Sequence, residues 1–113
     1  ASIFDGSIIG NQGIYVASAV TLTLGADGNV LEITGTTSID YITTTGWQNG
    51  SYITLIFAGI LTVNNNTGSV PVSTAAIRLS AAFVSSSEDT LTLVLSEQGG
   101  TVAWREVART VIT

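Results

Sequence analysis

The side chains that most often carry out covalent chemistry are scarce in this chain. It has 113 residues and lacks histidine, cysteine, methionine and lysine, while its charged residues are eight acids and three arginines. Without an imidazole, thiol or amine, no serine has a partner that could activate it as a nucleophile. The usual ligands of zinc and haem are missing as well. We therefore expect neither an enzyme of these classes nor a cofactor.

Carboxylate pairs are the remaining catalytic option, because glycoside hydrolysis needs only two acids that flank the scissile bond. The acids in or beside expected strands are Glu32, Asp40, Glu97 and Glu106. The acids in turns or near the N-terminus are Asp5, Asp27, Glu88 and Asp89. Solvated turns and pairing with arginine explain this distribution better than a catalytic cleft. We predict that Arg105 or Arg109 contacts a carboxylate, and Glu97 and Glu106 are the leading candidates.

Two short segments carry the oxygen ligands that calcium prefers. They are Asp27-Gly28-Asn29 and Asn64-Asn65-Asn66, and neither has the spacing of an EF-hand loop. Asp and Asn also stabilise turns by bonding to their own backbone. We therefore interpret both segments as turns and predict no metal site.

The two tryptophans are the most informative aromatic residues. Trp47 lies in a loop with Gly, Gln and Asn, where an exposed ring beside amide groups would suit stacking on a sugar. A loop tryptophan would suit a subunit interface equally well. Trp104 is expected to anchor either the core or an interface. The candidate interface or ligand contacts are Trp47, Gln48, Asn49, Trp104, Arg105 and Arg109.

The elements that position these residues are predicted to be β-strands. Thr, Ile and Val make up 40 of the 113 residues, and side chains branched at Cβ fit a pleated sheet better than a helix. The length indicates a single β domain over residues 1–113, with a possible N-terminal arm at 1–12. The net charge of −5 argues against nucleic acid or anionic membranes as partners. No apolar run approaches the roughly 20 residues of a membrane-spanning helix.

Alternation of apolar and polar residues predicts the individual strands. The clearest run covers 90–95, and Gly99-Gly100 predicts a tight turn into a strand at 101–107. Residues 52–58 are apolar in both alternating sets, which predicts a central strand covered on both faces.

Three further segments complete the predicted set of strands. Segments 20–24 and 30–34 flank a Gly-containing turn and predict a hairpin. Segment 74–79 predicts a strand that 81–84 continues. We therefore predict an all-β fold, an antiparallel β-sandwich or jelly-roll-like barrel of about eight to ten short strands.

An ordered set of short phrases resembles a β module of tailed bacteriophages. The phrases are Gly13-Ile14-Tyr15-Val16-Ala17-Ser18-Ala19, Leu22-Thr23-Leu24, Gly28-Asn29-Val30, Ile33-Thr34-Gly35-Thr36-Thr37-Ser38-Ile39, Gly50-Ser51-Tyr52-Ile53-Thr54-Leu55-Ile56-Phe57, Ile77-Arg78-Leu79, Asp89-Thr90-Leu91-Thr92-Leu93, Trp104-Arg105-Glu106 and Arg109. Together they span residues 13–109. In this order they are similar to head-fibre proteins, capsid decoration (cement) proteins and tail fibres.

The resemblance implies a structural virion protein without catalytic activity that works as a homotrimer. The chain lacks a heptad region or a collagen-like stalk, which favours a compact capsid decoration or head-fibre module. Such a module would bind the major capsid protein and stabilise the capsid by burying surface between its subunits. The alternative is a carbohydrate-binding module, a receptor-binding fibre or lectin-like β-sandwich, that attaches to a glycan.

Overall fold

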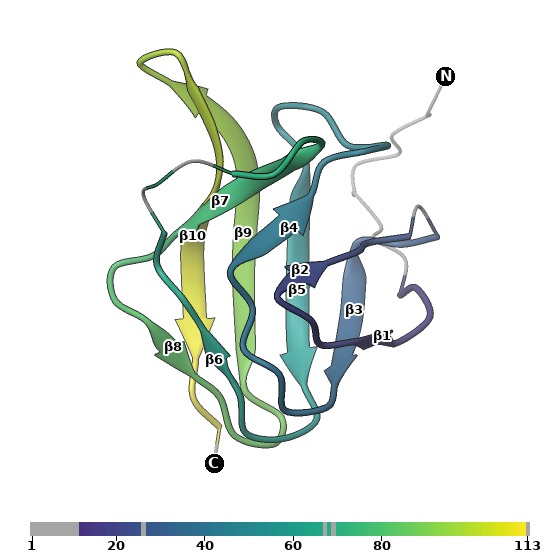
Figure 1. The fold of residues 1–113 in the computed structure, drawn as a ribbon. Helices are drawn as coiled ribbons and strands as arrows, with labels where there is room; N and C mark the ends of the chain where they lie inside the picture. Colours follow the sequence, from purple (N-terminus) through teal and green to yellow (C-terminus); the bar gives the residue numbers. More distant parts are fainter. Residues whose placement is uncertain (1–11, 26, 67, 69, 113) are drawn as a thin grey trace, which may run out of the picture.

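The computed structural model describes residues 12–25, 27–66, 68 and 70–112, and this part of the chain is all-β with no helix. It contains ten strands (Figure 1), which are β1 (Val16–Ala17), β2 (Thr21–Leu22), β3 (Val30–Thr34), β4 (Tyr41–Thr43), β5 (Tyr52–Phe57), β6 (Thr62–Val63), β7 (Thr74–Arg78), β8 (Phe83–Val84), β9 (Thr90–Gln98) and β10 (Thr101–Thr110). The predicted fold class is confirmed. The predicted N-terminal arm falls outside the described residues, apart from Gln12.

Eight strands form one large, curved sheet in the order β1-β3-β5-β9-β10-β7-β4-β2. Its middle is the β9–β10 hairpin, where Gly99 and Gly100 have φ angles of 61° and 84°. Two successive residues with positive φ match the twist of the strands that they join, so the predicted tight turn is confirmed. The pairs β1–β3, β3–β5, β7–β10 and β2–β4 are parallel. The sheet is therefore mixed and not antiparallel throughout.

The two edge strands of the large sheet are neighbours in the sequence. β1 ends at Ala17 and β2 begins at Thr21, so the chain passes from one edge to the other over residues 18–20. The sheet therefore curls into a nearly closed barrel. In Figure 1 the strands β2, β4 and β7 form the front layer, and β3, β5, β9 and β10 lie behind them.

The predicted hairpin between segments 20–24 and 30–34 is wrong. β2 pairs with β4 and β3 pairs with β5, both in parallel, so the two segments belong to opposite layers. The turn residue Asp27 instead accepts a hydrogen bond from the Ile14 amide at 2.8 Å. Parallel pairing joins strands that are distant along the chain, and local turn patterns do not reveal it.

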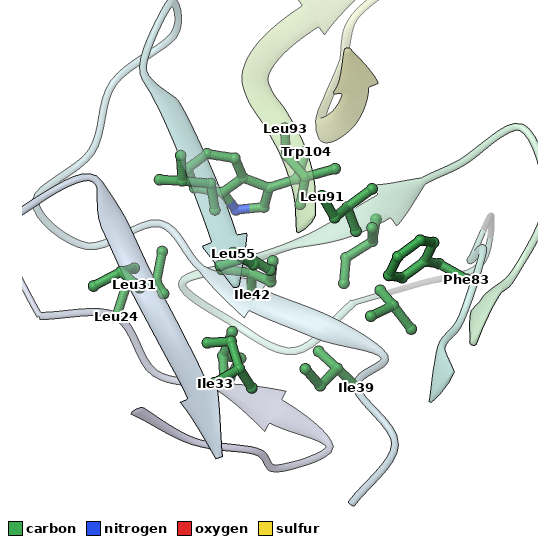
Figure 2. Packing of buried hydrophobic residues seen from close by; sticks show 14 of the residues in the cluster. Leu24, Leu31, Ile33, Ile39, Ile42, Leu55, Phe83, Leu91, Leu93 and Trp104 are labelled. Atoms are coloured by element: carbon green, nitrogen blue, oxygen red, sulfur yellow. The ribbon is translucent and has the colours of Figure 1, made fainter. Parts of the chain in front are cut away.

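The core lies between the two layers (Figure 2). Alternate residues of β3, β5 and β9 point into it, and fully buried residues include Leu31, Ile33, Ile53, Leu55, Leu91, Leu93 and Trp104. The residues between them on each strand point outward. β5 is therefore an interior strand, but its outward side chain Tyr52 is 54% exposed, which corrects the prediction that both of its faces are covered.

A small sheet of β6 and β8 covers one end of this core. Phe83 of β8 packs on Phe57 of β5, with ring centroids 5.4 Å apart. The buried Ser85 hydroxyl accepts a hydrogen bond from the Leu61 amide and donates one to the Gly59 carbonyl, which ties the two short strands together. Segment 81–84 thus does not continue β7 as predicted, because the chain leaves the large sheet after Arg78.

Candidate functional site

Strand β10 carries Arg105, Glu106 and Arg109, and a β-bulge decides where Arg109 points. Its pairing with β9 shifts between Glu106 and Ala108, so Val107 is an extra residue without a partner. Side chains alternate along a regular strand, so residues three apart would point to opposite faces. The bulge cancels one alternation, and Glu106 and Arg109 both lie opposite inward-facing leucines of β9.

Glu106 and Arg109 form a two-pronged ion pair at the rim of the core. Arg109 donates from Nε to Glu106 Oε2 at 2.7 Å and from Nη2 to Oε1 at 2.8 Å. The guanidinium also donates to the Ala81 carbonyl at 2.7 Å and lies 5.1 Å from the Phe83 ring centroid. Glu106 accepts hydrogen bonds from the Ser80 amide and hydroxyl. We call these five residues the polar corner; it holds the β7–β8 connection against β10.

The ion pair shifts the pKa of both partners. The hydrogen bond from Arg109 lowers the pKa of the Glu106 carboxyl from 4.5 to about 2, although partial burial opposes the shift. The same hydrogen bond raises the pKa of Arg109. Glu106 is therefore ionised at neutral pH. The prediction that Arg105 or Arg109 contacts a carboxylate is confirmed for Arg109 with Glu106.

Arg105 points to the opposite face of β10 and bonds to backbone and hydroxyl groups. Its Nη1 donates to the Ser96 carbonyl at 2.6 Å and to the Ser96 hydroxyl at 3.0 Å, and Nη2 donates to the Thr101 carbonyl. Glu97, the other predicted partner, instead accepts a hydrogen bond from the Gly100 amide in the hairpin turn. Arg105 and Arg109 therefore do not belong to one site.

The loop over residues 44–51, which we call the Trp47 loop, connects β4 to β5 and is held by backbone hydrogen bonds. The Trp47 amide donates to the Thr44 carbonyl, and the Gly50 amide donates to the Leu95 carbonyl at 2.7 Å. Gly50 has a φ of 98°, which a residue with a side chain rarely adopts. Gln48 and Asn49 are exposed at the tip of the loop.

The two tryptophans meet inside the molecule. Their ring centroids are 6.0 Å apart and the planes are inclined at 75°, an edge-to-face contact. Trp104 is fully buried, so it is an anchor of the core of this chain, and Trp47 is half-buried against that core. The tip of the loop is exposed as predicted, but the Trp47 ring is only partly exposed. Both indole Nε1 atoms are buried without a hydrogen-bond partner in the described part of the chain.

One structural carboxylate was missed by reasoning from the sequence. Asp89 is placed by its sequence in a Ser-rich turn, where a solvated carboxylate is expected, but it is 1% exposed. It accepts hydrogen bonds from the amides of Ser86 and Ile112 at 2.9 and 2.7 Å. The spacing of Ser86 and Asp89 could have predicted this contact, since Asp commonly bonds to nearby backbone in turns.

The described residues contain no group of three or more side chains suited to hold a metal ion, and none of their elements is a helix long and apolar enough to cross a membrane. Comparison with known proteins gave no match to a protein family, to a curated protein or to a solved structure. The candidate site thus consists of an internal polar corner, a loop with a half-buried tryptophan, and the outer surface of the sheet.

Proposed function

We propose that this chain is a structural virion protein, a capsid decoration or head-fibre module that acts as a homotrimer and binds the major capsid protein. The observation that carries the proposal is where the charged side chains lie. Glu106, Arg109 and Asp89 all make hydrogen bonds within the chain, and the outward residues of β3, β5, β9 and β10 include only two charged side chains, Glu32 and Arg105. A protein that functions by burying surface against other subunits needs such a surface, because desolvating unpaired charges opposes association.

The phage-like order of phrases along the sequence supports the same proposal. Two of its phrases now have a physical reason. Trp104 and Glu106 face inward, and the bulge at Val107 brings Arg109 to the same face. This spacing lets Arg109 pair with Glu106 and hold the β7–β8 connection against β10. A rigid structural module needs such internal contacts.

Co-sedimentation with capsids tests this function directly. The purified protein is mixed with expanded empty capsids of the virus whose genome encodes the chain. We expect it to pellet with the capsids at saturable stoichiometry and to raise their melting temperature. Failure to bind at micromolar concentration would contradict the proposal.

The exposed amides of Gln48 and Asn49 beside Trp47 favour a second candidate, carbohydrate binding. Sugar recognition by one ring and its amide neighbours gives affinities from millimolar to micromolar, roughly −4 to −8 kcal/mol. A glycan array followed by the Trp47→Ala variant separates the two functions. We expect the array to be blank; retention of a polysaccharide that is lost in the variant would favour the second candidate.

A further inference from the structure

The outward surface of β3, β5, β9 and β10 is broad and almost uncharged. The outward residues are Val30, Glu32, Thr34, Tyr52, Thr54, Ile56, Thr90, Thr92, Val94, Arg105, Ala108 and Thr110, none of which is fully buried. We call this surface the threonine face. It contains one acid, Glu32, and one base, Arg105, and its other ten residues are Thr, Val, Ile, Tyr and Ala.

The register of the strands places the two charges at opposite corners. Glu32 lies opposite Ile56, which lies opposite Thr90, so these residues form one row across the sheet. Arg105 lies opposite Val94, which lies opposite Tyr52, in a row four residues away along β9. On the neighbouring strand β7, Arg78 lies opposite Arg105 and adds a second arginine at this corner. Glu32 is on β3 at one side of the face, and Arg105 is on β10 at the other.

The middle of the face lies between these corners and is uncharged. Thr54 and Thr92 are opposite each other on neighbouring strands, and their hydroxyl oxygens are 3.1 Å apart. Four strands at about 4.8 Å spacing and three rows about 7 Å apart give a projected area of roughly 400 Å². The accessible area of side chains standing on a sheet exceeds its projection. The projected area is about half of the roughly 800 Å² that each partner contributes to a standard-size interface.

We propose that the threonine face packs against copies of the same chain, with Glu32 of one copy beside Arg105 of the next. The chain has a net charge of −5, so two copies repel each other wherever their acids meet. On this face the acid Glu32 and the base Arg105 lie at opposite corners, so they can pair between copies. Only the number of copies, three, rests on the proposed function.

The described contacts leave both charged groups able to make this pairing. Glu32 is exposed and has no partner among the described residues, so a second copy can supply one. Arg105 uses Nη1 and Nη2 within its own chain, and no described contact occupies its Nε. A guanidinium has five N–H donors and can serve both sets of acceptors at once.

Light scattering of wild-type protein and of a Thr92→Arg variant tests the position of the interface. Thr92 is at the centre of the face and points outward, so arginine can extend into solvent without disturbing the core. We expect the variant to dissociate at concentrations at least tenfold above those at which the wild type does. Thr23→Arg is the matched control, because Thr23 is exposed and follows β2 in the other layer. It should keep the wild-type mass.

A charge exchange tests the pairing itself. Glu32→Arg should weaken association at least tenfold, and adding Arg105→Glu in the same chain should restore it within about threefold. Circular dichroism confirms that each variant folds. A monomeric wild type, a Thr92→Arg variant with wild-type mass, or a double variant as weak as Glu32→Arg would each overturn the proposal. Capsid binding is measured separately, so its failure would contradict the proposed function and leave this interface standing.

Discussion

The polar corner and the threonine face lie on opposite sides of the same strand, β10, and use polar groups in opposite ways. In the polar corner, Arg109 and Glu106 satisfy each other and also bond to Ser80 and Ala81. On the threonine face, the contact between Thr54 and Thr92 links neighbouring hydroxyls, and Glu32 remains exposed without a described partner. The comparison shows that the ion pair of Glu106 and Arg109 closes the fold, whereas the two charges of the proposed contact surface lie apart from each other.

The largest expected effect in this comparison is that of Arg109→Ala. The change removes the ion pair, the bond to the Ala81 carbonyl and the contact with Phe83, and it leaves the Glu106 carboxylate mostly buried without its cation. We expect a loss of about 2–4 kcal/mol in the free energy of unfolding. Urea denaturation measures it. Arg105→Ala is the control and should cost about 1 kcal/mol, because Arg105 bonds to neutral groups and its loss leaves no carboxylate without a cation. Equal losses for the two variants would contradict the different roles assigned to the two sides of β10.

Acid should weaken the polar corner in a defined pH range. The folded-state pKa of Glu106 is about 2, below its ordinary value of 4.5, so its contribution is fully present above pH 4.5 and is lost as the pH falls toward 2. We expect Glu106→Gln to lower stability at pH 7 by about 1–2 kcal/mol and to reduce the fall between pH 4.5 and pH 2. Stability profiles of wild type and variant that remain parallel over this range would contradict the role assigned to Glu106.

The threonine face should contribute little to the stability of the single chain. Thr54→Val and Thr92→Val each remove one hydroxyl from the outward contact and keep the β-branched shape. We expect changes within about 0.5–1 kcal/mol in denaturation under dissociating, dilute conditions. A loss as large as that of Arg109→Ala would mean that the face is part of the internal architecture.

The smallest effect is expected from chelators and reductants. The chain has no cysteine, and the described residues contain no metal-ligand cluster. EDTA and dithiothreitol should therefore leave the melting temperature unchanged in a thermal scan. A decrease of several degrees in EDTA would indicate a bound cation, with the Asp27 turn and the asparagine segment as the first places to examine.

The sequence predicts local features of this fold much better than distant ones. Alternation identifies β9, and Gly99-Gly100 identifies the hairpin, because neighbouring residues determine both. The partners of β2 and β3 are not predictable in this way, because parallel pairing depends on strands far away in the chain. The hairpin prediction was wrong for that reason.

The candidate site shows the same limit. The scarcity of bases predicted that Arg105 or Arg109 would contact Glu97 or Glu106, but it could not select the pair of Arg109 and Glu106. The bulge at Val107 selects that pair, and no pattern of apolar residues in the sequence reveals the bulge. The loop position of Trp47 suggested exposure, whereas Trp104 offers it a ring to pack against. Burial of a loop residue depends on what the rest of the fold places beside it.

The mass of the wild-type protein in solution tests the central claim most directly. If the threonine face is a contact surface between copies and the proposed homotrimer forms, light scattering at micromolar concentration should give three times 11.6 kDa. The mass should fall to that of one chain in Thr92→Arg and stay unchanged in Thr23→Arg. A stable species of 11.6 kDa for the wild type at this concentration would contradict the account.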